Sequence, residues 1–246
     1  MLDDPKMLLI AVLAAICIGL AKAGFTGISM VSVVLLADVY GAKPSVGLAL
    51  PLLIAADLMA YPAFLKHGSW KPVWKLLPAA LAGLLAGWWL LGEINDHVAR
   101  RLIGGCVLLM VLLQAFRTLK PQRFKELADS HGFGLSAGIL GGFSTMLANA
   151  AGPVIQLYLL TRRIPKMEMI GISARFFLLI NLIKVPLNAR LALITEASLW
   201  ENAKLLPAVF IGIIFGKWMI GRVPQAVFEW MVVGFSFLAA VRLLRG

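Results

Sequence analysis

The chain contains 246 residues, of which 61% are apolar and 14% are charged, and its mean hydropathy is +0.90. Soluble domains have roughly half apolar and about a quarter charged residues, so this composition excludes a water-exposed globule and indicates a membrane protein. The formal charge is +11, but the basic residues are spread over short loops between apolar runs. That pattern is typical of cytoplasmic loops in membrane proteins and argues against nucleic-acid binding.

The first apolar run, residues 7–23, is predicted to be a retained transmembrane helix. Asp3 and Asp4 precede it, whereas a cleavable signal begins with a basic region. Cys17 in this run and Cys106 in a later run both lie in apolar surroundings. We expect each to be a small buried hydrophobe and not half of a disulfide.

Further apolar segments follow, and together they predict an all-α polytopic membrane protein without a sizeable aqueous domain. The segments are 27–40, 45–65, 73–91, 98–117, 133–148, 152–161, 169–189, 203–221 and 226–243. Segments 27–40 and 152–161 are too short to cross a hydrocarbon core of ~30 Å at ~1.5 Å per residue. We expect them to be half-helices or arms of re-entrant hairpins.

The polar stretch 120–131 at the midpoint predicts a linker between a first repeat, 1–119, and a second, 132–246. KLLPAALAGLLAGWWLLG at 75–92 matches KLLPAVFIGIIFGKWMIG at 204–221 in nine of 18 positions. Two tandem repeats of four to five helical segments each therefore follow, as in many secondary transporters. An odd number of crossings per repeat makes the repeats inverted and an even number makes them parallel; the inverted arrangement is expected.

Small residues recur every four positions within these matching segments, as Ala79, Gly83 and Gly87 and then as Ala208, Gly212 and Gly216. Such a row lines one face of a helix and allows a neighbouring helix to approach closely. We expect both rows to be packing surfaces.

Two breaks, residues 24–27 and 149–153, occupy corresponding places in the two repeats. Breaks at membrane depth are tolerated where they line a cavity, and the helix that follows presents free N–H groups and a positive dipole end to an anion. The alternative is that the glycines merely allow close packing or a tight loop. The predicted substrate-binding residues are Lys22, Gly24, Thr26, Gly27, Ser29, Asn149, Gly152 and Arg175.

Ionisable residues lie within or at the edges of apolar segments at Lys22, Asp57, Arg175 and Lys184. Charges at membrane depth are expensive, so such residues usually face a pathway or a partner. Lys22 and Lys184 can alternatively extend to the membrane surface. Asp57 corresponds to Asn181 in the second repeat, and this pair is the predicted coupling site.

The sequence offers no convincing catalytic, metal or cofactor site. A G-x-S-x-G pattern surrounds Ser136, but a nucleophile elbow requires a strand before it, and none is predicted. His67, His97 and His131 are scattered over loops without a cluster of cysteines or carboxylates. No Walker motif is present, so coupling to protons or to the membrane potential is expected.

The duplicated pattern of a glycine-rich break, a short segment and a GxxxGxW hairpin resembles the TauE/SafE sulfite-exporter family of bacterial permeases. The matching residues run from Gly19 through Gly27 and from Val46 to Leu119, then through 138–142, 151–155 and 171–173 to Leu244. The resemblance implies a transporter of sulfite, sulfonates and related organosulfur anions, often directed outward.

These observations together predict a multi-pass protein of the cell (inner) membrane and not an enzyme. The expected function is secondary transport of small oxyanions by alternating access, in the direction of export. An anion channel and a membrane-embedded enzyme or assembly subunit acting on lipid remain the alternatives. The expected partners are the anion and the membrane lipids, with no nucleic acid and no cofactor; a homo-oligomer is left open.

Overall fold

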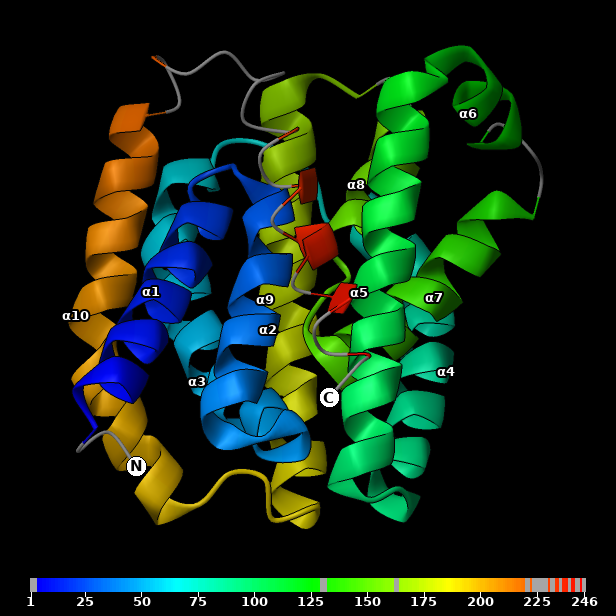
Figure 1. The fold of residues 1–246 in the computed structure, drawn as a ribbon. Coiled ribbons are helices and arrows are strands. Elements are labelled where there is room, and N and C mark those ends of the chain that lie inside the picture. The colour runs from blue at the N-terminus through cyan, green and yellow to red at the C-terminus, as the bar shows by residue number, and fades with distance from the viewer. Residues whose placement is uncertain are drawn as a thin grey trace.

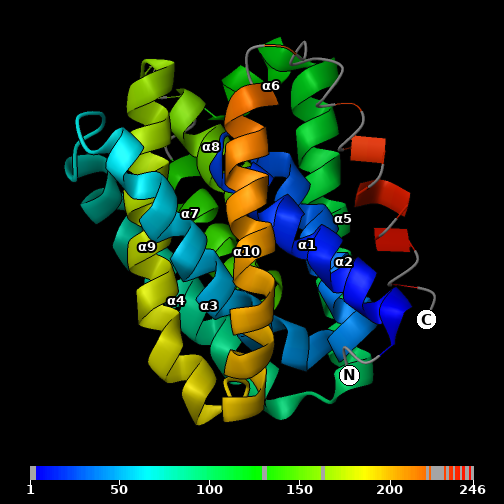
Figure 2. The ribbon, with the colours of Figure 1, turned by 90° about the vertical axis from the view of Figure 1, so that its left-hand side faces the viewer.

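The chain forms a bundle of helices in which neighbouring segments run up and down (Figures 1 and 2). The computed structural model describes residues 4–128, 132–161 and 164–219, together with scattered positions between 222 and 244. Within this part of the chain every regular element is helical. The predicted all-α fold is therefore confirmed, whereas most of the predicted segment 226–243 lies outside the described residues.

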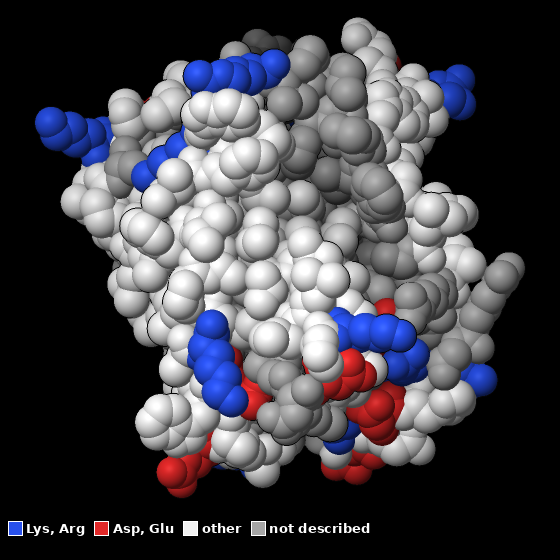
Figure 3. All heavy atoms as spheres, turned by 60° about the vertical axis from the view of Figure 1, so that its left-hand side comes forward, with Lys and Arg blue, Asp and Glu red and all other residues white. Residues whose placement is uncertain are grey.

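Among the residues that the structure describes, six helices are long and apolar enough to cross a membrane. They are α1 (Pro5–Lys22), α3 (Ala42–Ala60), α4 (Lys71–Glu93), α5 (Asp96–Leu119), α9 (Lys166–Arg190) and α10 (Glu196–Met219). On the face that Figure 3 shows, a broad belt without charged side chains crosses the middle of the molecule, and the lysines, arginines and acidic residues gather toward its two ends. This distribution suits a protein embedded in a bilayer.

Three shorter helices lie at the predicted breaks. They are α2 (Ser29–Tyr40), which follows the 3-10 turn η1 (Thr26–Ile28), α7 (Phe133–Ala148) and α8 (Gly152–Thr161). At ~1.5 Å per residue none of them reaches across a core of ~30 Å. The short segments predicted for α2 and α8 are therefore confirmed, with α7 as a third.

The predicted polar linker contains a helix that the sequence analysis did not anticipate. α6 (Pro121–Ala128) is short, and Phe124 is its buried residue. The Phe124 ring makes edge contacts with Phe116 of α5 and Phe133 of α7, at centroid distances of 6.1 and 6.2 Å. Because these contacts attach α6 to α5 and α7, the stretch is more than a connection between helices.

The small-residue rows form two equivalent helix contacts. α4 packs along α7, and α10 packs along α1 (Figure 2). A Cβ atom at Gly83 would lie 1.9 Å from the carbonyl oxygen of Ile139, and one at Gly212 would lie 2.3 Å from that of Ile16. Only a residue without a side chain allows such an approach, so the prediction that these rows are packing surfaces is confirmed.

The partner helices α7 and α1 also contribute glycines to these two contacts at equivalent places. A Cβ atom at Gly142 of α7 would lie 1.8 Å from the carbonyl oxygen of Ala80, and one at Gly19 of α1 would lie 2.2 Å from that of Val209. Each contact between α4 and α7 thus has its counterpart between α10 and α1.

α3 and α9 lie side by side and run in opposite directions (Figures 1 and 2). Asp57 contacts Asn181 near one end of the pair, and Gly47 contacts Leu193 just beyond the other end. The residue numbers therefore rise along α3 as they fall along α9. Three buried charged residues, Asp57, Arg175 and Lys184, lie on these two helices.

Candidate functional site

Both predicted breaks are present as interruptions of the helical backbone. Gly24, with a φ of 125°, separates α1 from η1, and Asn149, with a φ of 51°, separates α7 from α8. Glycine takes up positive φ at little cost, and asparagine tolerates the left-handed region better than most residues. η1 contacts α8, so the segments that follow the two breaks meet inside the protein.

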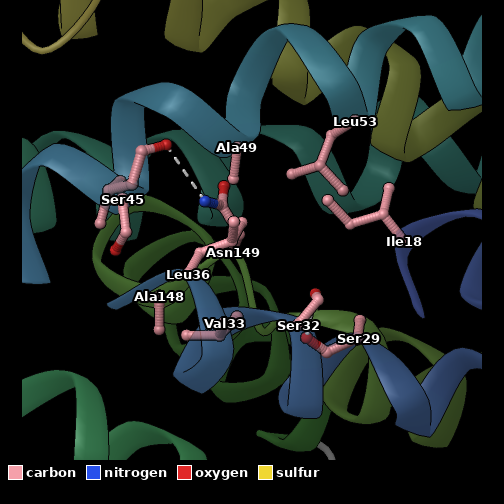
Figure 4. A pocket seen from close by; sticks show the side chains of 11 residues that line it. Ile18, Ser29, Ser32, Val33, Leu36, Ser45, Ala49, Leu53, Ala148 and Asn149 are labelled. Atoms are coloured by element: carbon pink, nitrogen blue, oxygen red, sulfur yellow. Dashed lines mark hydrogen bonds between the residues drawn. The ribbon is translucent and has the colours of Figure 1, made fainter. Parts of the chain in front are cut away.

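A pocket lies between the two breaks, and we call it the serine pocket. Polar side chains enter it from α2, from α3 and from the second break, and aliphatic side chains complete its wall (Figure 4). Its lining consists of Ile18, Ser29, Ser32, Val33, Leu36, Ser45, Val46, Ala49, Leu53, Ala148 and Asn149. Two predicted site residues from different repeats, Ser29 and Asn149, therefore share one pocket.

Asp57 is the negatively charged partner of an ion pair in the interior of the protein. It is 2% exposed; Lys22 Nζ lies 2.7 Å from its Oδ1, and Asn181 Nδ2 donates to its Oδ2 at 2.8 Å. Lys22 also lies 4.9 Å from the ring centroid of Phe177, a cation–π distance. The structure thus brings together Lys22, Asp57 and Asn181, and the two predicted coupling residues touch each other.

Lys184 is a second buried cation, with 0% of its surface exposed. Its Nζ donates to the carbonyl oxygen of Thr145 at 2.7 Å and to Asn149 Oδ1, and it lies 3.5 Å from Thr145 Oγ1. Asn149 Nδ2 donates in turn to the carbonyl oxygen of Val46 at 3.2 Å. Lys184 therefore holds the second break against α9 and does not extend to the membrane surface.

We call Lys22, Asp57, Thr145, Asn149, Asn181 and Lys184 the buried polar centre. Asn149 belongs both to this centre and to the serine pocket. The centre holds two cationic side chains and one carboxylate, so it carries one uncompensated positive charge when all three are ionised.

Arg175 has a different environment. It is 5% exposed, and its guanidinium donates to the carbonyl oxygens of Leu65, His67 and Gly171, with distances of 2.9 Å for Leu65 and 3.0 Å for Gly171. These bonds fasten the loop between η2 (Tyr61–Phe64) and α4 to α9. The anion-binding role of Arg175 stays a prediction, and the geometry favours a structural role.

The remaining predicted residues are backbone positions at the breaks. Gly24, Gly27 and Gly152 are half-buried, and Gly152 begins α8. Thr26 begins η1, but its side chain lies outside the part of the chain that the structure describes.

Lys184 stands out in the sequence as a charge within an apolar segment, but it is not among the predicted site residues. Its position three residues after Asn181 places both side chains on one face of α9. That spacing was the available signal, but an isolated lysine in an apolar segment fits a membrane-surface position equally well. The contact with Asn149 depends on tertiary structure and has no local signature.

Ser136 has no catalytic surroundings. It is exposed on α7, and its Oγ donates to the carbonyl oxygen of Gly132 in the same helix at 3.1 Å. The residue is helical and is not at the end of a strand, so the G-x-S-x-G pattern does not form a nucleophile elbow here.

Comparison with known proteins agrees with this architecture. Residues 9–243 match the model of the family described as "Sulfite exporter TauE/SafE". The chain is also 24% identical over 177 residues to the "Probable inner membrane transporter protein TsaS" of Comamonas testosteroni, covering 68% of this chain and 72% of that protein. No solved structure matches the chain.

The match to the family model extends over nearly the whole chain, from the middle of α1 to beyond α10. It confirms the resemblance seen in the glycine-rich breaks, and it confirms a multi-pass membrane transporter in place of an enzyme. With its interrupted helices and its charged interior, the chain belongs to the TauE/SafE sulfite-exporter family of membrane transporters.

Proposed function

We propose that the protein is a secondary transporter of small oxyanions, such as sulfite, sulfonates or related organosulfur anions, and that it exports them by alternating access. The observation that carries this proposal is the charge of the buried polar centre, where Lys22 and Lys184 outnumber Asp57. A desolvated anion requires compensating charge, and charge-assisted hydrogen bonds are stronger than neutral ones.

In this proposal the serine pocket supplies the uncharged hydrogen-bond donors of the same site. Ser29 and Ser32 lie on α2 below the pocket, and Asn149 lies above it (Figure 4). Hydroxyl and carboxamide groups donate to oxyanion oxygens without adding a fixed charge. We place the substrate among Lys22, Ser29 and Asn149, with the backbone N–H groups at Gly27 and Gly152 as further donors.

We further propose that residues 1–119 and 132–246 are inverted repeats joined by 120–131. The antiparallel course of α3 and α9, which occupy equivalent places in the two repeats, supports this arrangement, and so do the matching contacts of α4 with α7 and of α10 with α1. Inverted repeats typically move against each other around a substrate site near the middle of the membrane.

Asp57 and Asn181 are the proposed coupling residues. While Asp57 is ionised, it holds Lys22 at 2.7 Å. Protonation of Asp57 would remove this counter-charge and leave Lys22 available to an anion. Binding of a proton and binding of the anion would then favour each other, which is the requirement for coupled movement.

A counterflow screen with purified protein in proteoliposomes tests the proposal. Vesicles loaded with unlabelled sulfite should accumulate labelled sulfite transiently, and other small oxyanions should compete. Accumulation should saturate with concentration. Flux that rises without saturation would identify an anion channel, and failure of every tested oxyanion to exchange would refute the proposed substrate class.

A further inference from the structure

One face of α9 carries a row of buried polar side chains. Asn181, Lys184 and Asn188 follow one another at spacings of three and four residues, which places them on the same side of the helix. All three are buried, and Lys184 and Asn188 are both 0% exposed. A polar row of this kind in a membrane-spanning helix requires polar partners along its length.

The charges of Lys22, which is half-buried, and of Lys184, which is buried, are balanced differently. Lys22 has the carboxylate of Asp57 at 2.7 Å. Lys184 donates only to neutral oxygens of Thr145 and Asn149, and among the residues that the structure describes no carboxylate forms an ion pair with it. The charge of Asp57 also acts on Lys184, but its carboxylate is already paired with Lys22. A buried ammonium whose hydrogen-bond acceptors are all neutral is incompletely compensated, so a bound anion would add the compensation that Lys184 lacks.

Asn188 adds an independent observation one helical turn further along α9. Neither its Nδ2 nor its Oδ1 has a hydrogen-bond partner within the described part of the chain. Buried carboxamides are nearly always hydrogen-bonded, and each exception calls for an explanation, such as a bound water or ion. A polar ligand next to Lys184 would supply the missing acceptor for Nδ2.

We propose that Lys184 and Asn188 bind the transported anion directly, Lys184 with its ammonium group and Asn188 with its carboxamide N–H. This inference rests on the proposed function and assigns the decisive charge of that site to Lys184. The anion takes the place of Asn149 Oδ1 as an acceptor for Lys184. Anion binding thereby releases Asn149, and with it the second break, from α9.

Sulfite binding to purified protein in detergent tests the inference through the thermal unfolding midpoint, measured against sodium chloride of equal ionic strength. We expect sulfite to raise the midpoint of the wild-type protein in a saturable manner, as a ligand of the folded state does. Lys184→Met should abolish the sulfite-dependent shift. Lys184→Arg should keep the shift with roughly tenfold weaker affinity, because arginine retains the charge with a different geometry.

Asn188→Ala should weaken the affinity about tenfold, the loss expected for one hydrogen bond to a charged group. Lys75→Met is the matched control, because Lys75 is an exposed lysine of α4, and it should bind sulfite as the wild-type protein does.

The possible failures are distinguishable. A wild-type protein whose midpoint no oxyanion shifts would refute the proposed function, and this inference with it. A shift that persists in Lys184→Met at wild-type affinity would overturn the inference while leaving the proposed function standing. If Lys184→Met does not fold, Lys184→Arg and Asn188→Ala decide, and wild-type affinity in both would overturn the inference.

Discussion

The two halves of the molecule share their packing but not their charges. The contact of α4 with α7 has the same glycine-to-backbone geometry as the contact of α10 with α1. The charged residues of the buried polar centre, in contrast, correspond to uncharged residues in the other half. Lys22 corresponds to Thr145 at an offset of 123 positions, the offset that also relates Gly19 to Gly142. Asp57 corresponds to Asn181 and Lys184 to Ala60, both at an offset of 124 positions.

The contact between α3 and α9 gives a physical reason for this difference. Asp57 and Asn181 occupy equivalent positions and lie within hydrogen-bond distance, 2.8 Å, of each other. A second aspartate at residue 181 would place two buried carboxylates in contact, which disfavours the ionisation of both. Helix packing can therefore follow the repeat, whereas the charges at its centre must differ between the halves.

The largest expected effect on stability comes from removing the carboxylate of the ion pair between Lys22 and Asp57. Asp57→Ala leaves the ammonium of Lys22 without its partner, and breaking a buried pair in this way costs about 3–5 kcal/mol. We expect a strong loss of folded protein in size-exclusion chromatography.

The double variant Lys22→Met/Asp57→Leu removes both charges and provides the comparison. It should recover folded yield, because neither half of the broken pair is left charged, yet it should not recover coupled transport. Equal yields for the single and double variants would contradict the ion pair.

Because the contact of α4 with α7 and the contact of α10 with α1 share their geometry, equivalent glycine substitutions in the two contacts should lower stability by similar amounts. Gly83→Ala and Gly212→Ala each push a methyl group against a backbone carbonyl, and overpacking of this kind typically costs about 1–3 kcal/mol. Thermal unfolding should show similar destabilisation for both variants. Gly105→Ala is the control, since a Cβ atom there meets nothing within 4 Å; a drop as large in this variant would refute the packing explanation.

The sequence was sufficient to predict the apolar helices, the breaks and the glycine packing surfaces, because each has a local signature, whereas the polar helix α6 was predicted as a linker. Apolar runs gave the helices, and Gly24 and Asn149 lie in the breaks. Pairings between distant side chains have no such signature. The hydrogen bonds of Arg175 to three carbonyl groups of the loop and of its own helix could not be predicted, and its binding of the anion stays a prediction. The contact of Lys184 with Asn149 could not be predicted either.

Substitution of Arg175 should have a smaller effect on stability, and it distinguishes a structural role of this residue from a role in anion binding. Arg175→Lys keeps the positive charge but loses the planar fork that reaches several carbonyl groups. We expect a loss of roughly 1–2 kcal/mol in stability, measured by thermal unfolding, with unchanged sulfite affinity. A fall in affinity with unchanged stability would instead support anion binding at Arg175.

The last prediction concerns the orientation of the protein in the membrane, and the cysteine substitutions that test it should leave transport unaltered. The end of the molecule that carries α6 is bordered by basic residues, whereas both signs of charge gather at the opposite end (Figures 1 and 3). Basic loops stay in the cytoplasm. After replacement of Cys17 and Cys106, a cysteine at Gln122 of α6 should resist an impermeant thiol reagent in intact cells.

A cysteine at Ala197, which is exposed near the start of α10, is the matched probe of the opposite end and should react. Reversed labelling of the two positions would overturn the orientation.

The location of a bound anion tests the central claim most directly. Selenite resembles sulfite and scatters anomalously at the selenium edge, so diffraction from crystals grown with selenite can locate it. We predict a selenium peak in the interior, bounded by Lys22, Asn149 and Lys184. A peak confined to the surface or to the loop held by Arg175, with the interior empty, would contradict the account.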